Sequence, residues 1–173
     1  TILNYLTGSE MLVSEISEFK LITRIQNIIS PQNETSLQSI KSLGHDLKLS
    51  IGDDAAVFES SHTTNVVTTD ALVENVHFNL DWTSFEDLGW KSIIASQSDI
   101  ASMGCIPTFA VITLGLRPDL PVDGIVELYH GMVTACQEIG GTIIGGDTVA
   151  SKSFFISVTM NGSTTKHHNG TKF

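Results

Sequence analysis

Basic residues are scarce in this sequence. Nine lysines and arginines stand against nineteen aspartates and glutamates, which gives a formal net charge of −10. Nucleic acids and anionic membranes are bound through clustered basic side chains, so this balance argues against both as partners. An acidic chain can still bind phosphate groups where divalent cations mediate the contact.

Cysteines and long apolar runs are also few. The only two cysteines, Cys105 and Cys136, lie in apolar segments without the spacing of metal ligands, so we expect reduced thiols in a cytoplasmic protein. No apolar run approaches the ~20 residues that a membrane helix needs, and no signal peptide is recognisable. The sequence also lacks a GxxxxGK(S/T) phosphate loop and any legible Ser-His-Asp or Cys-His arrangement.

The rest of the composition is typical of a globular domain. Of the 173 residues 41% are hydrophobic, which suffices for one core-forming domain. Apolar periodicity predicts helices over residues 15–29, 83–103 and 122–139. Apolar runs predict strands over residues 55–59, 66–70, 107–116, 142–144 and 153–161. The first two strands suggest a hairpin and residues 32–50 a polar loop, within a two-layer α/β arrangement.

Five aspartates stand where predicted apolar elements meet loops, which is where α/β proteins gather their sites. They are Asp53 and Asp54 in IGDDAAVF, Asp70 in VVTTDAL, Asp99 in SQSDIASMG and Asp147 in TIIGGDT. Carboxylates that converge on one place at neutral pH need a hard cation, and magnesium with its oxygen ligands is the natural candidate. The Gly-Gly before the last aspartate would let a phosphate approach the backbone closely. A single aspartate or a Gly-Gly-Asp is also a common turn former, so spacing alone leaves both interpretations open.

Four stretches of the chain resemble the N-terminal half of bacterial thiamine-monophosphate kinases in their order and spacing. They are IGDDAAVF, VVTTDALVENVHF, EDLGWKSIIASQSDIASMGCIPTFAVITLGL and GTIIGGDT, within residues 18–162. The ending VHF separates this family from its sisters in the superfamily of aminoimidazole ribonucleotide synthetase, selenophosphate synthetase and a hydrogenase maturation factor. The resemblance implies an α/β domain of the α+β type, with a mixed, mostly antiparallel sheet covered by helices.

The resemblance also implies a division of the chain and a function. Residues 14–162 would form the ATP- and magnesium-binding N-terminal domain, after a leader or tag at residues 1–13 and before an interdomain connection at residues 163–173. The family transfers a phosphoryl group in line from ATP to thiamine monophosphate, which gives thiamine diphosphate, with several magnesium ions as cofactor. The implied partners are ATP, thiamine monophosphate and a second copy of the chain, which would pair with the first through the N-terminal domains.

Specific site residues follow from the matched motifs. The implied magnesium ligands are Asp53, Thr68, Thr69, Asp70, Asp99 and Asp147, with the threonines acting through backbone or hydroxyl oxygens. The implied ATP contacts are Tyr129, Gly146 and Asp147, and the implied contact to thiamine monophosphate is His77. Asp54 has a weaker claim and can simply cap or orient its loop. Tyr129 also fits a core tyrosine, His77 an ordinary strand histidine, and the His167-His168 pair a solvated terminus.

Two departures from the family pattern bear on function. Ser96 stands where the family usually has an asparagine, which alters a contact near Asp99 but leaves the carboxylate in place. The family's second domain, which supplies further site residues, is missing from this chain. We therefore expect a chain that folds, dimerises and has little kinase activity alone. The alternatives are a non-catalytic nucleotide-binding or dimerisation domain, or another ATP-dependent enzyme of the superfamily.

Overall fold

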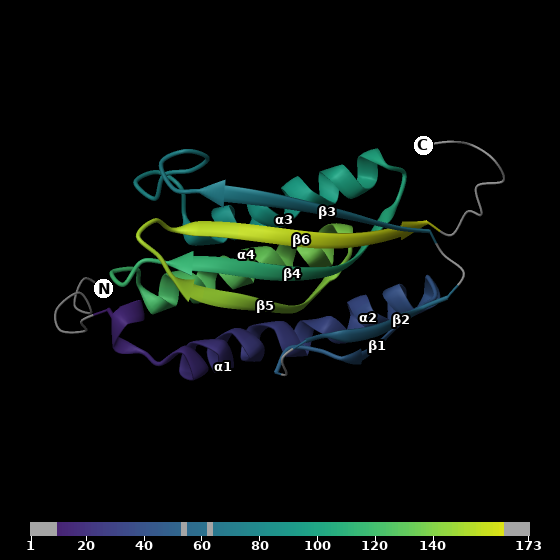
Figure 1. Cartoon of the computed structure of the whole chain (residues 1–173), viewed down its shortest axis with the longest axis horizontal. Helices are drawn as coiled ribbons and strands as arrows, with labels where there is room; N and C mark the ends of the chain where they lie inside the picture. The colour runs from purple at the N-terminus through teal and green to yellow at the C-terminus, as the bar shows by residue number, and fades with distance from the viewer. Residues whose placement is uncertain (1–9, 53–54, 62–63, 165–173) are drawn as a thin grey trace, which may run out of the picture.

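A four-stranded sheet forms the centre of the fold in the computed structural model, which describes residues 10–52, 55–61 and 64–164. The strand order is β3-β6-β4-β5 (Figure 1). The bounds are Thr64–Val73 for β3, Ile106–Leu116 for β4, Thr142–Ala150 for β5 and Phe155–Thr164 for β6. Strands β4 and β5 are parallel, and the other two pairings are antiparallel. This confirms the predicted mixed, mostly antiparallel sheet.

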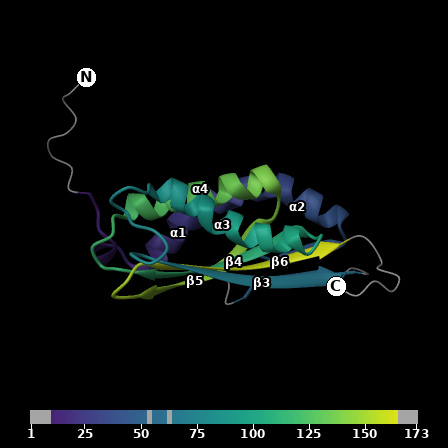
Figure 2. The ribbon, with the colours of Figure 1, turned by 90° about the horizontal axis from the view of Figure 1, so that it is seen from above.

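Two long helices, α3 (Phe85–Ser102) and α4 (Val122–Ile139), cover one face of this sheet (Figure 2). Both were predicted to within two residues from their apolar periodicity. Met132 of α4 and the sheet residues Ile112 and Val158 belong to the resulting core and are at most 1% exposed. The predicted α+β architecture with helices over the sheet is thereby confirmed.

Helices α3 and α4 approach each other closely because each presents a glycine to the other. A Cβ atom added at Gly89 would lie 1.9 Å from the backbone oxygen of Leu128, and one added at Gly131 would lie 1.9 Å from the backbone oxygen of Glu86. Any side chain at either position would force the two backbones apart. The glycines therefore allow the close packing of α3 against α4.

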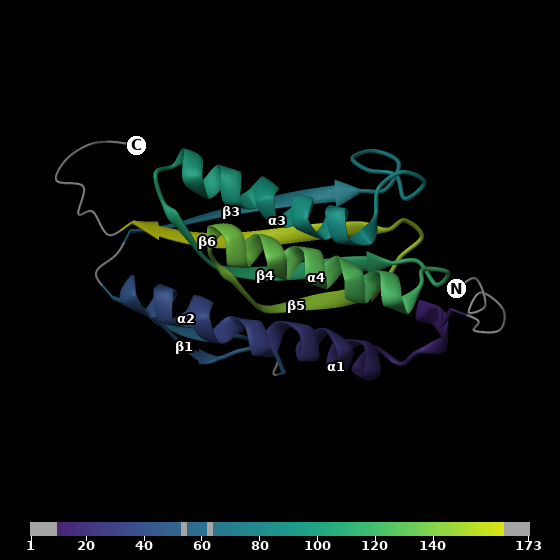
Figure 3. The ribbon, with the colours of Figure 1, turned by 180° about the vertical axis from the view of Figure 1, so that it is seen from behind.

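The remaining elements lie along the β5 side of the molecule (Figure 3). They are the helices α1 (Glu18–Ile29) and α2 (Asn33–Ser42), the strands β1 (His45–Leu49) and β2 (Val57–Ser60), and two short 3₁₀ turns at Val13–Glu15 and Ser30–Gln32. Helix α1 confirms the prediction for residues 15–29, and the turn after it contains Pro31. The small strand pair β1–β2 packs its His45 and Phe58 against Phe109 of β4.

Two predictions about this region are wrong. Residues 32–50 are not a polar loop, because they contain α2 and β1. Most side chains of these two elements are polar and face solvent, so the few buried ones did not stand out in the sequence. The hairpin predicted for residues 55–59 and 66–70 does not form either. Strand β2 pairs with β1, while β3 pairs with β6 over ten residues. The long ladder with β6 satisfies far more backbone groups than a local hairpin would.

The strand predicted over residues 142–144 is much longer in the structure. Strand β5 continues to Ala150 and contains Gly145, Gly146 and Asp147. The Gly-Gly-Asp sequence is therefore part of an edge strand, and the interpretation of it as a turn is wrong. Aspartate and glycine are rare in strand interiors, which is why propensity alone ends the strand too early.

The first described residues are hydrogen-bonded into the fold. The backbone N–H of Val122 donates to the oxygen of Met11 at 2.8 Å, and that of Val13 donates to the oxygen of Leu120 at 2.8 Å. A leader that ends at residue 13 remains a prediction. In the described part of the chain no helix is long and apolar enough to cross a membrane.

Both cysteines are buried free thiols, as expected. Cys136 lies on α4 inside the core, and its burial raises the pKa of the thiol to about 12. This thiol is therefore protonated at neutral pH and has little of the thiolate character that reactivity needs.

Candidate functional site

Strand β3 and helix α3 bring together four oxygen-bearing side chains that we call the β3–α3 cluster: Thr68, Asp70, Ser96 and Asp99. The Thr68 hydroxyl donates to Oδ2 of Asp99 at 2.8 Å, and the Ser96 hydroxyl donates to Oδ2 of Asp70 at 2.8 Å. Alternation along β3 puts its two members on the face covered by α3, and a spacing of three residues puts the other two on one side of the helix.

The cluster differs in exposure from one member to the next. Ser96 is buried, Asp70 is half-buried, and Asp99 is exposed. Each carboxylate accepts a hydrogen bond from a hydroxyl group at one of its oxygens. Its other lone pairs are available to further hydrogen-bond donors or to a metal ion. Ser96 therefore contributes a hydrogen-bond donor to Asp70, and not to Asp99.

The donors of the β3–α3 cluster suit a hard cation. Carboxylate and hydroxyl oxygens are ligands of Mg²⁺, which proteins usually bind through one or two carboxylates together with substrate phosphates and water. Asp70 and Asp99 would provide such a pair. No group of three or more His, Cys, Asp or Glu residues that could hold a metal occurs in the described ranges. Completion of a magnesium site would thus require phosphate oxygens or ligands from elsewhere.

Two other predicted ligands lie on the opposite face of the sheet. Thr69 receives a hydrogen bond from the Thr159 hydroxyl at 3.1 Å, on the face away from α3 and α4. Asp147 pairs with Thr113, which in turn pairs with Ser157, and this row belongs to the same face, away from α3 and α4. The structure therefore brings Thr68, Asp70 and Asp99 together, and it does not bring the Thr69 hydroxyl or Asp147 to them.

Asp53 and Asp54 fall outside the described residues. The glycine before them has a structural role that the structure does describe. Gly52 has a φ of +122°, a conformation that residues with a side chain rarely adopt. The glycine of the IGDD motif is thus required by the backbone conformation at this position.

Two of the predicted ATP contacts, Gly146 and Tyr129, lie in packed parts of the fold. A Cβ atom at Gly146 would lie 2.0 Å from the backbone oxygen of Ile112, so packing against β4 already requires glycine there. Tyr129 is 4% exposed and belongs to the core, and burial raises the pKa of its phenol. This burial favours the interpretation of Tyr129 as a core residue. The ATP contacts remain predictions.

His77 lies in the loop between β3 and α3, so it is not the strand histidine that the sequence left as an alternative. The backbone N–H of Val73 donates to its Nδ1 at 3.0 Å, and its own N–H donates to the oxygen of Val73 at 2.8 Å. Lys91 Nζ donates to its carbonyl oxygen at 2.9 Å. Because Nδ1 is an acceptor, the neutral ring carries its proton on Nε2, on the side away from the strand.

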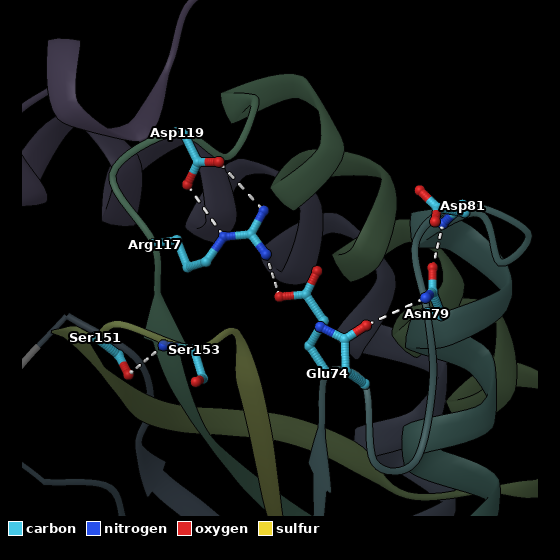
Figure 4. Close-up of polar contacts among 8 residues, drawn as sticks. Glu74, Asn79, Asp81, Arg117, Asp119, Ser151 and Ser153 are labelled. Atoms are coloured by element: carbon cyan, nitrogen blue, oxygen red, sulfur yellow. Dashed lines mark hydrogen bonds and ion pairs between the residues drawn. The ribbon is translucent and has the colours of Figure 1, made fainter.

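One charged group at the end of the sheet was not anticipated from the sequence. Arg117, directly after β4, forms ion pairs with Glu74 and with Asp119 (Figure 4). Its Nε and Nη2 atoms lie 3.1 and 3.3 Å from the two carboxylate oxygens of Asp119. Glu74 lies 43 positions from Arg117 in the sequence, and the only sequence signal was an arginine at the end of an apolar strand.

Comparison with known proteins gives one family and several relatives. Residues 52–164 match the family described as AIR synthase related protein, N-terminal domain. The thiamine-monophosphate kinase of Mycobacterium tuberculosis is 38% identical over 111 residues, which are 64% of this chain and 33% of that protein. The chain therefore spans much less than the whole length of that relative.

Solved structures give the same picture. The thiamine-monophosphate kinase of Stenotrophomonas maltophilia is 32% identical with a TM-score of 0.66, over 86% of this chain and 43% of that one. A structure described as AaThiL complexed with AMPPCP and TMP is 31% identical with a TM-score of 0.58, over 91% of this chain and 45% of that one. In both cases this chain corresponds to less than half of its relative.

Proposed function

We propose a function on one premise: this chain belongs to the AIR synthase related protein family, whose N-terminal domain it carries over residues 52–164. The proposed function is the ATP-dependent phosphorylation of thiamine monophosphate to thiamine diphosphate, a step of thiamine biosynthesis, to which this chain contributes the N-terminal domain. Relatives named thiamine-monophosphate kinase and a relative solved with AMPPCP and TMP support this choice. A cytoplasmic location remains a prediction.

The observation that carries the proposal is the β3–α3 cluster. Asp70 and Asp99 come from two separate motifs of the resemblance, and the fold places them on two packed elements, β3 and α3, each with a hydroxyl donor from the other element. Two carboxylates and two hydroxyls are hard oxygen donors of the kind that Mg²⁺ accepts as ligands. This arrangement supports a phosphate-binding role that operates through magnesium.

The residues of this chain would act by holding and orienting the reactants. Magnesium, when bound, supplies positive charge that offsets the charge of the phosphates. Asp70 and Asp99 would hold it, while Thr68 and Ser96 fix the orientation of the two carboxylates. The Nε2–H of His77 would donate to the phosphate of thiamine monophosphate. The attacking phosphate oxygen is already ionised, so in-line transfer needs no strong general base.

Isothermal titration of this chain with AMPPCP, with and without magnesium, tests the proposal. We expect binding that depends on magnesium, because the acidic cluster repels bare phosphates. Binding of equal strength without magnesium would contradict the role given to the carboxylates. An absence of binding in both conditions would favour the second candidate, a dimerisation domain without a nucleotide site of its own.

The exposed part of the sheet face away from α3 and α4 supports a homodimer. Val67 of β3, Val111 of β4 and Val149 of β5 are exposed there, beside the Thr69–Thr159 pair. A broad face with exposed valines is a typical site of protein association. We propose that two copies of the chain pair through this face.

A lysine in place of Val67 is expected to convert the dimer to a monomer, because the association would bury the new charge without a partner. The Val67 side chain is 68% exposed in the single chain, and that of Val76, in the loop after β3, is 72% exposed. Val76→Lys is therefore the matched control and should leave the dimer intact. Sedimentation velocity measures both. A wild-type chain that sediments as a monomer, or a dimeric Val67→Lys chain, would contradict the pairing.

A further inference from the structure

We propose that Arg117 is a positioning residue for His77, which it holds in place through Glu74 at the start of the loop between β3 and α3. This inference deepens the proposed function and rests on it for the identity of the ligand, thiamine monophosphate. The direction in which the His77 ring presents Nε2 would then depend on an ion pair at the end of β4.

The loop that carries His77 is closed by short-range hydrogen bonds. Asn75 adopts a left-handed conformation with a φ of +62°, and its N–H donates to the oxygen of Phe78 at 2.7 Å. The amide of Asn79 donates to the side-chain oxygen of Asn75 at 3.1 Å. His77 is bonded back to Val73 through both its ring and its backbone. The orientation of the ring therefore follows the position of the chain at residues 73–75.

Glu74 fixes the position of residues 73–75, and for this it needs a positively charged side chain beside it. Its backbone N–H donates to the oxygen of Phe154 at 2.9 Å, and its side chain is only 9% exposed. A carboxylate that is nearly removed from water requires a charged partner. Among the described residues, Arg117 is the partner with which Glu74 forms an ion pair.

Arg117 is well suited to this task. Its guanidinium uses Nη1 for Glu74 and Nε with Nη2 for Asp119, so it is held from two sides (Figure 4). Asp119 and then Glu74 raise the pKa of Arg117, so the group stays charged at all ordinary pH values. Strand β6 lies between β3 and β4, and the Arg117–Glu74 pair therefore ties together two strand ends that are not neighbours.

Removal of Arg117 would leave the Glu74 carboxylate buried and unpaired. The carboxylate would then turn to solvent and draw the start of the loop with it, which would break the bond from Val73 to Nδ1 of His77. Removal of both charges, in Glu74→Gln/Arg117→Met, takes away the reason for this movement. The double variant should therefore restore the His77 orientation that the single Arg117→Met variant loses.

Nitrogen chemical shifts of the His77 ring, measured by NMR on the full chain without ligand, test this inference. The wild-type ring should be the Nε2–H tautomer, with Nδ1 as acceptor. We expect a mixture of tautomers in Arg117→Met and a return to the wild-type shifts in Glu74→Gln/Arg117→Met. The matched control is Arg24→Met, which removes an exposed ion pair with Asp123 and should leave His77 unchanged.

Wild-type His77 shifts in a folded Arg117→Met chain would overturn the proposal. If that variant does not fold, Arg117→Gln serves instead, because a glutamine removes the charge but keeps hydrogen-bond donors in the space of the guanidinium. Unchanged shifts in Arg117→Gln would likewise overturn it. Titration with thiamine monophosphate should show about 10- to 100-fold weaker binding in Arg117→Met than in wild type. A wild-type chain that does not bind this ligand but shows the expected shifts would contradict the proposed function and leave the positioning role supported.

Discussion

Replacement of Asp70 by asparagine is expected to weaken the magnesium-dependent binding of AMPPCP by about 100-fold or more, since residues that merely orient a metal ligand already contribute about 10- to 100-fold. Asparagine has the shape of aspartate, and its side-chain oxygen can still accept the hydrogen bond from Ser96. The substitution thus removes one negative charge and little else. Asp99→Asn should act in the same way, because the new asparagine keeps an acceptor oxygen for the Thr68 hydroxyl.

Two measurements make this result interpretable. Thermal unfolding should show little change for Asp70→Asn, because the local hydrogen bond survives. Asp123→Asn is the matched control: Asp123 is an exposed aspartate on α4 whose ion pair with Arg24 is solvated, so its loss should not affect nucleotide binding. Binding of AMPPCP by Asp70→Asn at wild-type strength in the presence of magnesium would rule out the β3–α3 cluster as the metal site.

The β3–α3 cluster illustrates what the sequence can predict. Its aspartates stand in recognisable motifs, alternation along the strand places Thr68 and Asp70 on one face, and helical spacing aligns Ser96 with Asp99. The same alternation places Thr69 on the opposite face, which the motif alone does not reveal. Local periodicity is therefore sufficient to predict on which side of a strand or helix a residue lies.

Pairings between segments that are distant in the chain could not be predicted from the sequence. Thr69 meets Thr159 from 90 positions away, and Glu74 meets Arg117 from 43 positions away. Nothing in the local pattern of β3 specifies β6 as its partner, and a nearby polar turn favoured the wrong hairpin. Strand β5 was cut short for a related reason, since Gly146 is there to fit against the backbone of β4 and not to form a turn.

A second large effect is expected from Gly131→Ala, which should lower the free energy of unfolding by about 3 kcal/mol, the upper end of the usual cost of overpacking. The new Cβ would lie 1.9 Å from the backbone oxygen of Glu86 and 3.0 Å from the backbone nitrogen of Trp90, and neither atom can rotate away. Alanine gains about 1 kcal/mol over glycine in helix propensity, which is too little to offset this contact. At about 2–4 °C per kcal/mol, the melting temperature should fall by roughly 6–12 °C.

Gly145→Ala provides the control for this prediction. A Cβ at Gly145 would meet its nearest neighbour, a methyl carbon of Val111, at an ordinary 3.8 Å, so we expect a change of less than about 1 kcal/mol. Chemical denaturation of both variants gives the comparison. Equal stabilities for Gly131→Ala and the wild type would mean that the helices can separate freely.

The two glycines of the α3–α4 contact also connect stability with the proposed site. Gly89→Ala alone should be about as damaging as Gly131→Ala, because each glycine faces a backbone oxygen of the other helix. The double variant should cost less than the sum, since the first methyl group already separates the helices for the second. Ser96 and Asp99 travel with α3, whereas Thr68 and Asp70 stay on β3. A helix displaced from its partner therefore carries half of the β3–α3 cluster with it, and a folded Gly131→Ala chain should bind magnesium–AMPPCP more weakly even though the substitution touches no cluster residue.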